Sequence, residues 1–106
     1  MANVRISIPE TAQKGEVIEI KTLISHPMES GFRVGIFGET IPRNILTDFQ
    51  CLYNGEEVFR AEFFPAVTAN PFLTFHTIAQ ESGELSFVWT DQHGEVTTET
   101  RSITVT

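Results

Sequence analysis

Apolar residues recur at every second position along most of this chain, which is the period of a β-strand with one buried and one solvated face. Helical spacing is almost absent. The alternation predicts seven short strands, at residues 4–8, 18–24, 45–53, 56–64, 73–79, 85–89 and 96–105. The segments between them carry glycine and proline, the residues that most often interrupt strands. The pattern therefore predicts an all-β chain.

The turns and the strand parity refine this prediction. Asn54-Gly55 indicates a tight hairpin, because both central positions of a type I′ turn need positive φ. In the last predicted strand Val96 has the opposite parity to Ile103 and Val105. Either a β-bulge lies between them, which we favour, or this strand pairs differently along its length. Seven antiparallel strands with closely spaced turns are typical of an immunoglobulin or fibronectin III-like β-sandwich.

Length and charge limit the classes of function. The 106 residues suffice for one domain, which we expect to span 1–106. Fourteen acidic residues against seven basic ones give a net charge of −7, which disfavours nucleic-acid binding. No stretch approaches the roughly 20 apolar residues of a membrane-spanning helix, so we expect no membrane role. The first residues show no secretory signal pattern, which by itself indicates a cytoplasmic protein.

The residues that could carry chemistry are few. Cys51 lies at an inward position between Phe49 and Tyr53, and we favour a buried core thiol over a nucleophile. The alternative is a persulfide-handling protein in which a histidine activates the Cys51 thiolate. The three histidines lie in no metal-binding motif. We therefore expect no enzyme, no metal and no cofactor.

Two connecting segments are candidate contact surfaces. Residues 25–44 are long for a connection in so small a domain and contain apolar residues that would be costly to expose. Either they fold back as a short hairpin with Gly38-Glu39 near its tip, capping the sandwich, or some of them meet another chain. Residues 63–72 contain two successive phenylalanines. A bend at Pro65 that buries both is slightly favoured over an exposed contact loop containing Phe64.

Four segments resemble the SoxZ family: Ile24-Ser-His-Pro-Met-Glu-Ser-Gly31, Ile41-Pro-Arg43, the run Cys51 to Phe59, and Ala69-Asn-Pro-Phe72. SoxZ is the non-catalytic half of the SoxYZ sulfur carrier of thiosulfate-oxidising bacteria. The resemblance implies that the chain forms a heterodimer with SoxY. It would thereby help to present sulfur intermediates, bound to a cysteine of SoxY, to transiently docking Sox enzymes.

The resemblance also implies a location and a set of contact residues. SoxZ-like chains are thought to reach the periplasm by co-export with SoxY, which contradicts the cytoplasmic interpretation above. Exposed edge strands make a homodimer plausible when the chain is alone. The residues that we predict to bind a partner lie in the two connecting segments: His26, Met28, Phe32, Arg33, Arg43, Phe64, Asn70 and Phe72.

Overall fold

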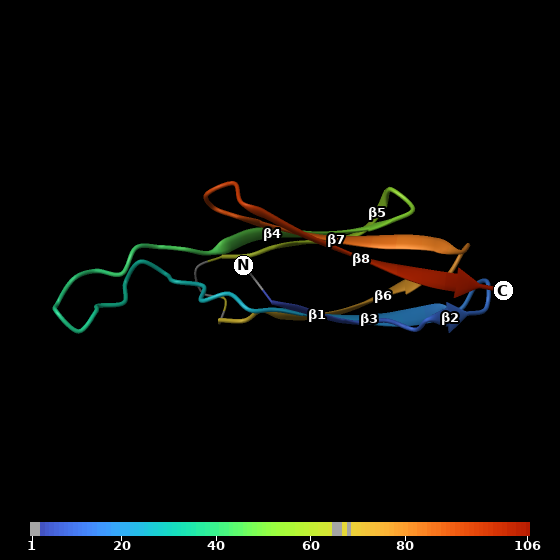
Figure 1. The fold of residues 1–106 in the computed structure, drawn as a ribbon, viewed down its shortest axis with the longest axis horizontal. Coiled ribbons are helices and arrows are strands. Elements are labelled where there is room, and N and C mark those ends of the chain that lie inside the picture. Colours follow the sequence, from blue (N-terminus) through green and yellow to red (C-terminus); the bar gives the residue numbers. More distant parts are fainter. Residues whose placement is uncertain (1–2, 65–66, 68) are drawn as a thin grey trace.

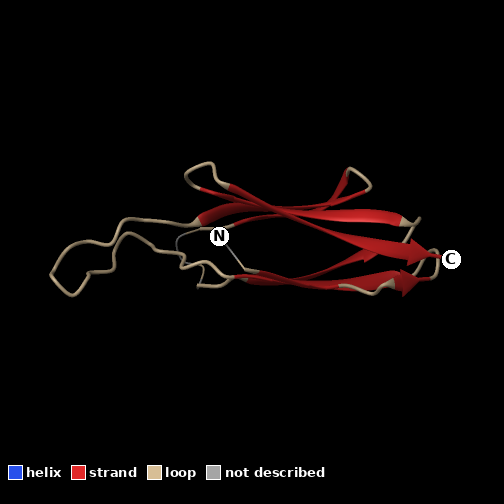
Figure 2. Ribbon diagram, in the orientation of Figure 1, coloured by secondary structure: helices blue, strands red, loops and turns tan. Residues whose placement is uncertain are grey.

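The computed structural model describes residues 3–64, 67 and 69–106, and it confirms the all-β sandwich (Figures 1 and 2). Within these described residues, eight strands form two facing sheets. Their bounds are β1 Val4–Ser7, β2 Thr11–Ala12, β3 Val17–Ile24, β4 Leu46–Tyr53, β5 Glu56–Glu62, β6 Phe72–Ile78, β7 Gly83–Asp91 and β8 Val96–Val105. The described residues contain no helix capable of spanning a membrane.

The smaller sheet has the order β1-β3-β6 and is antiparallel throughout. Its central strand, β3, alternates exposed and buried residues, as the sequence predicted. Ile18, Ile20 and Ile24 are buried beneath it, while Glu19 and Lys21 face solvent. The strand β6 therefore forms one edge of this sheet, and among the described strands it pairs only with β3.

The larger sheet has the order β2-β8-β7-β4-β5. Asn54 and Gly55 both have positive φ, 49° and 86°, which confirms the tight hairpin between β4 and β5. The strand that the sequence analysis missed is β2, which pairs with β8 in parallel over only two residues. A two-residue strand is too short to show a period in its sequence.

An aromatic cluster fills the space between the sheets. Phe49 of β4 lies at its centre, with ring centroids 5.0 Å from Trp89, 5.8 Å from Phe75 and 6.1 Å from Phe59. Phe59 and Phe75 stack at 4.2 Å and nearly parallel, which joins the β5 edge of one sheet to the β6 edge of the other. Because these rings come from both sheets, the cluster holds the two layers together.

The expected bulge in the last strand is wrong. The β7–β8 pairing keeps one register from Gly83↔Ile103 to Thr90↔Val96. Val96 is simply exposed on the outer face, since its neighbours of the same parity are exposed as well. The register shifts lie instead beside β4, where Val58 of β5 and Thr47 of β4 are the unpaired extra residues.

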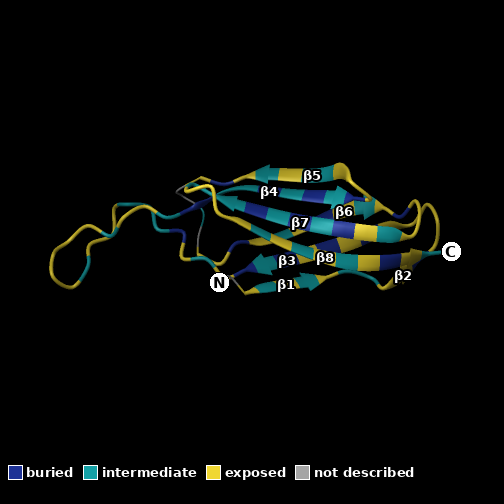
Figure 3. Cartoon of the chain, turned by 45° about the horizontal axis from the view of Figure 1, so that its top comes forward, coloured by how far each residue is buried: buried dark blue, intermediate teal, exposed yellow. Residues whose placement is uncertain are grey.

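The connection from β3 to β4 projects away from the sandwich as an arm, which we define as residues 25–44 (Figure 1). The described residues measure 58 × 20 × 20 Å, and the arm extends along the long axis, at the end opposite the C terminus. Figure 3 shows buried residues along the strands and mainly exposed or intermediate ones along the arm. The arm therefore does not cap the sandwich.

Candidate partner-binding surfaces

The arm is a hairpin whose two sides are held together by main-chain hydrogen bonds. Glu29 and Asn44 each donate their N–H to the other's carbonyl, at 2.8 Å in both directions. Further out, the N–H of Ile41 donates to the Arg33 carbonyl at 2.8 Å. The tip turns at residues 35–39, close to the predicted Gly38-Glu39. Of the two possibilities left open by the sequence, the segment does fold back as a hairpin, but it does not cap the sandwich (Figure 1).

Gly31 fits the two sides of the arm together. Its φ is 90°, which L-residues rarely adopt, and a Cβ at this position would lie 3.2 Å from the Cβ of Arg43 on the opposite side. Both the backbone conformation and the close approach therefore favour glycine here.

The outer part of the arm, residues 32–39, exposes large apolar side chains, and we call this part the tip. Phe32 is 86% exposed, Ile36 92% and Phe37 88%. Full burial of such a side chain is worth about 1.5–3 kcal/mol, and little of that free energy is gained within this chain. Our predicted contact residues include Phe32 but omit Ile36 and Phe37, although a glycine on either side of this pair indicates a turn tip.

The base of the arm joins the two connecting segments. The N–H of His26 donates to Asn70 Oδ1 at 2.9 Å, and the N–H of Asn70 donates to the His26 carbonyl at 2.7 Å. Asn70 has φ 53°, a conformation that asparagine tolerates better than most residues. Two predicted contact residues that are 44 positions apart in sequence therefore lie side by side.

Met28 has a different place from the one expected of a contact residue. Its side chain is only 5% exposed, and its Sδ accepts the N–H of Leu46 at 3.2 Å. A side chain in this position packs in the core and anchors the arm to β4. A partner cannot reach it unless the arm base opens.

The two arginines of the arm are held by partners within the chain. The Arg33 guanidinium donates to the Glu29 carboxylate, with Nη2 2.6 Å from Oε1. This hydrogen bond lowers the pKa of Glu29 and raises the pKa of Arg33. Arg43 Nε donates to Gln92 Oε1 at 3.1 Å. With two glutamates and two arginines the arm is formally neutral, so the charge of −7 lies outside it.

The second candidate segment is only partly described, because Pro65, Ala66 and Thr68 lie outside the described residues. Phe63 is buried, but Phe64 is 61% exposed. The expectation that both rings are buried is therefore wrong. The N–H of Phe63 donates to the Thr47 carbonyl, which holds the Phe63 backbone beside β4. Phe72 begins β6 and is exposed on the outer face of the smaller sheet.

A hollow of about 230 Å³ lies beside His26 and is lined in part by Asn44, Asp91 and Glu95. His26 Nδ1 accepts the N–H of Met28 at 3.0 Å, so the neutral ring carries its proton on Nε2. Burial lowers the pKa of His26, and the charges of Asp91 and Glu95 partly oppose this. Asn44 Oδ1 is the only buried side-chain nitrogen or oxygen in the described residues without a hydrogen-bond partner.

Cys51 is fully buried, as expected. Burial raises the pKa of its thiol to about 12, which disfavours the reactive thiolate that the alternative function needs. Within residues 3–64, 67 and 69–106, no three histidine, cysteine or acidic side chains lie close enough to hold a metal ion.

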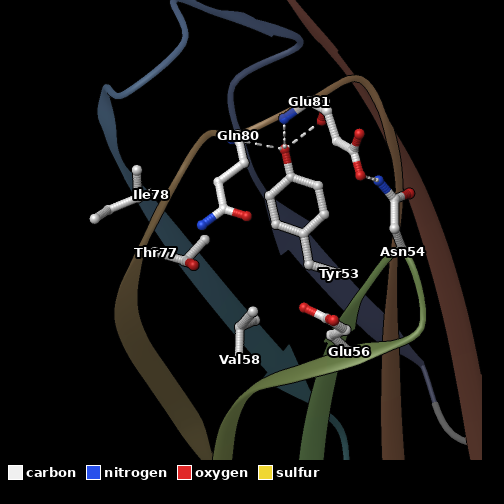
Figure 4. Close-up of a pocket in the computed structure, with 8 residues that line it drawn as sticks. All are labelled: Tyr53, Asn54, Glu56, Val58, Thr77, Ile78, Gln80 and Glu81. Carbon is white, nitrogen blue, oxygen red and sulfur yellow. Dashed lines mark hydrogen bonds between the residues drawn. The ribbon is translucent and has the colours of Figure 1, made fainter.

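Another hollow, of about 340 Å³, lies between β5 and β6 (Figure 4). The Tyr53 hydroxyl donates to the Glu81 carbonyl and accepts the N–H groups of Gln80 and Glu81, each at 3.3 Å. Tyr53 thereby ties the β6–β7 turn to β4. The remaining lining includes Glu56, Val58 and Ile78, which do not converge on a common point in this view. This arrangement supports a structural role.

Solved structures share this fold at low sequence identity. A superoxide reductase (neelaredoxin) from Ignicoccus hospitalis is 17% identical with a TM-score of 0.75, covering 97% of this chain and 80% of its own. The sulfur carrier protein SoxY from Chlorobium limicola f thiosulfatophilum is also 17% identical, with a TM-score of 0.68 and coverage of 97% and 78%. At such identity these likenesses support the fold alone.

No curated protein sequence matches the chain. A family model does: the one described as sulphur oxidation protein SoxZ matches residues 4–102, almost the whole length. The motifs quoted above at residues 24–31, 41–43, 51–59 and 69–72 all lie inside this match. The chain belongs to the SoxZ family.

Proposed function

We propose that this chain is the SoxZ subunit of a SoxYZ sulfur carrier. It binds SoxY and, without catalysing a reaction itself, helps to present the cysteine-bound sulfur intermediates of SoxY to the Sox enzymes of thiosulfate oxidation. Membership of the SoxZ family supports the sulfur-oxidation role. The proposal extends to the periplasm, which the chain would reach bound to SoxY.

The observation that carries the binding role is the exposed tip of the arm. Phe32, Ile36 and Phe37 are almost fully solvated. They lie on a hairpin whose stem, defined as the part around the paired residues Glu29 and Asn44, is held by main-chain hydrogen bonds. Aromatic and aliphatic anchors on a projecting element are the kind of residue that dominates interface energies. A neutral arm on an acidic chain also meets another protein with little charge repulsion.

The sulfur chemistry of such a carrier needs an accessible thiol, and this chain has none among its own residues. Its one cysteine is buried, and burial raises the thiol pKa to about 12. We therefore place the sulfur-bearing thiol on SoxY and give this chain a geometric role. It holds in place the part of SoxY from which the segment with this thiol extends. It also supplies part of the surface that the enzymes meet.

The experiment is a binding titration with the SoxY protein of the same source, followed by light scattering on a sizing column. We expect a one-to-one complex. The double variant Phe32→Ser/Phe37→Ser should weaken it by at least about thirtyfold, because each ring is expected to act as an anchor. Val96→Ser is the matched control, since Val96 is also an exposed apolar residue but lies on β8.

The possible outcomes separate two claims. If the two folded proteins form no complex, the proposed function is wrong. If the complex forms and the arm variant binds as tightly as the control, the SoxZ role stands and the arm is not the SoxY contact.

A further inference from the structure

The two longest edge strands of the sandwich differ in how they are protected against pairing with another chain. Four of the seven residues of β5 are charged, and a bulge at Val58 interrupts its register. Such charges and bulges are common means of blocking an edge. By contrast, β6 has no charged residue, no proline and no register shift against β3. No described strand pairs with its other side, which can therefore accept a further strand.

The residues of β6 are also self-complementary. Its outer face carries Phe72, Thr74, His76 and Ile78, in the order apolar, polar, polar, apolar. If a second β6 pairs antiparallel about Phe75, Phe72 lies opposite Ile78 of the other copy, and Thr74 lies opposite His76. All seven residues pair in this register. If the register shifted by two residues in either direction, each copy would have one of its two outer apolar residues, Phe72 or Ile78, opposite a polar residue. The other apolar residue would lie beyond the end of the paired strand.

We propose that two copies of this chain pair through β6 in this register, forming a continuous six-stranded sheet of order β1-β3-β6-β6-β3-β1. A two-fold axis passes beside Phe75, and the same surface is used by both molecules. Backbone hydrogen bonds provide the attraction, and the two Phe72–Ile78 pairs fix the register.

This pairing accounts for apolar residues that the fold leaves in solvent. Phe72 is 59% exposed and Ile78 50%, both on the outer face of an edge strand. The flanking β3 residues opposite them are Leu23 and Val17, also apolar. In the dimer each end of β6 therefore joins an apolar stripe of four residues: Leu23 and Phe72 of one copy with Ile78 and Val17 of the other.

The electrostatics predict how the dimer responds to salt. The strand β6 contains no lysine, arginine, aspartate or glutamate, and His76 Nε2 lies 3.5 Å from Glu19 Oε2 of β3. Glu19 also pairs with Lys21, which lies beside Thr74. The remaining repulsion comes from two bodies that each carry −7. Because salt screens such repulsion over about 8 Å at physiological ionic strength, added salt should strengthen the dimer.

A pair of charge variants tests the register. In the proposed dimer residue 74 of each copy lies opposite residue 76 of the other copy, so this contact occurs twice. The variant Thr74→Glu/His76→Glu puts glutamate opposite glutamate at both contacts, whereas Thr74→Lys/His76→Glu puts lysine opposite glutamate at both. We expect sedimentation over a range of concentrations to show dimerisation of the first about tenfold weaker than wild type and that of the second at least as strong.

The two variants separate dimerisation from fold stability. Within one molecule residue 74 lies opposite Lys21, so the fold should favour glutamate there, while the dimer favours lysine. Equal dimerisation of the two variants, or a monomeric wild-type protein at every concentration, would overturn the proposal.

Cross-linking tests the same register without added charge. Directly opposite residues have Cβ atoms about 4.5–5.5 Å apart, and diagonal ones about 7–8 Å. A mixture of Thr74→Cys and His76→Cys proteins should therefore form covalent dimers with oxidised glutathione faster than either protein alone. Cys51 is buried and does not interfere. Equally fast cross-linking of Thr74→Cys alone would contradict the register.

This inference does not depend on the SoxZ role, because the dimerisation and cross-linking measurements use this chain alone. If wild type is monomeric, but Thr74→Glu/His76→Glu weakens its complex with SoxY, the edge serves the heterodimer and the self-pairing proposal is wrong. If the chain dimerises as described and never binds SoxY, the proposed function fails and the β6 surface stands.

Discussion

Phe49 and Phe37 are the same residue type in opposite surroundings. Phe49 is fully buried on β4 among aromatic rings from both sheets, while Phe37 is 88% exposed at the tip of the arm. Removing the Phe49 ring from water stabilises the fold, whereas the Phe37 ring gains little such free energy within the chain. The buried apolar residues of the sandwich therefore stabilise the fold, whereas the exposed ones at the tip of the arm are available to another molecule.

The stem of the arm makes this contrast informative. Reciprocal hydrogen bonds between Glu29 and Asn44, together with buried Met28, hold the arm in place while its tip contributes nothing to the core. Substitutions of buried residues in the sandwich should therefore lower the free energy of unfolding, and substitutions at the tip should not. Changes at the stem should affect the arm more than the body.

Phe49→Ala should have the largest effect. It removes the centre of the aromatic cluster, and we expect the free energy of unfolding to fall by about 3–5 kcal/mol in urea denaturation. Phe37→Ala is the matched control, with an expected change within about 0.5 kcal/mol because its ring is exposed. A comparable loss for both variants would show that the arm tip packs against the body in solution.

Cys51→Ser tests the buried thiol. The change places a hydroxyl at a fully buried position among aromatic side chains, and we expect a loss of about 1–3 kcal/mol in the free energy of unfolding. In the wild-type protein a thiol reagent should react with Cys51 only after denaturation. Rapid reaction of the native protein would instead favour the persulfide-handling alternative.

The same contrast explains how much could be predicted from the sequence. The strands of the sandwich could be predicted because a strand with one buried face has apolar residues at every second position, as at Ile18, Ile20 and Ile24. The Asn54-Gly55 hairpin was found because its backbone conformation restricts residue choice. Local rules of this kind do not reach the two-residue β2, which exists only through its pairing with β8.

The candidate surfaces were predicted less well, for a physical reason. Whether the arm lies on the sandwich or projects from it depends on contacts between residues far apart in the sequence. The spacing of apolar residues does not report such contacts. Met28 illustrates this, because the same apolar residue suits an interface or the core, and only its contact with Leu46 places it in the core. Similarly, nothing local distinguishes buried Phe63 from exposed Phe64.

Gly31→Ala should disturb the arm without unfolding the body. A φ of 90° costs a residue with a Cβ about 1–2 kcal/mol, and the new Cβ would press on Arg43. We expect faster amide exchange at the stem and unchanged exchange in β4 and β7. Gly38→Ala is the control, with φ 83° but no atom within 4 Å of its Cβ, so it should leave the Glu29–Asn44 hydrogen bonds intact. Equal stem exchange in both variants would assign the effect to backbone strain alone.

The smallest expected effect is a pH dependence at the base of the arm. Burial lowers the pKa of His26 from its usual 6.5, so the folded chain holds this ring neutral more strongly than the unfolded chain does. The unfolded state therefore binds more protons as the pH falls below 6.5, and stability is lost from there down to the folded pKa, below which the loss is constant.

The geometry indicates where that loss should appear. Protonation of Nδ1 removes the acceptor for the N–H of Met28, so acidic pH should loosen the base of the arm. The substitution His26→Asn is the matched test, because its Oδ1 can accept a similar hydrogen bond but does not titrate. We expect amide exchange at Met28 to rise on acidification in the wild-type protein and to change less in the variant. The same pH response in both proteins would show that His26 does not cause the loosening of the arm base.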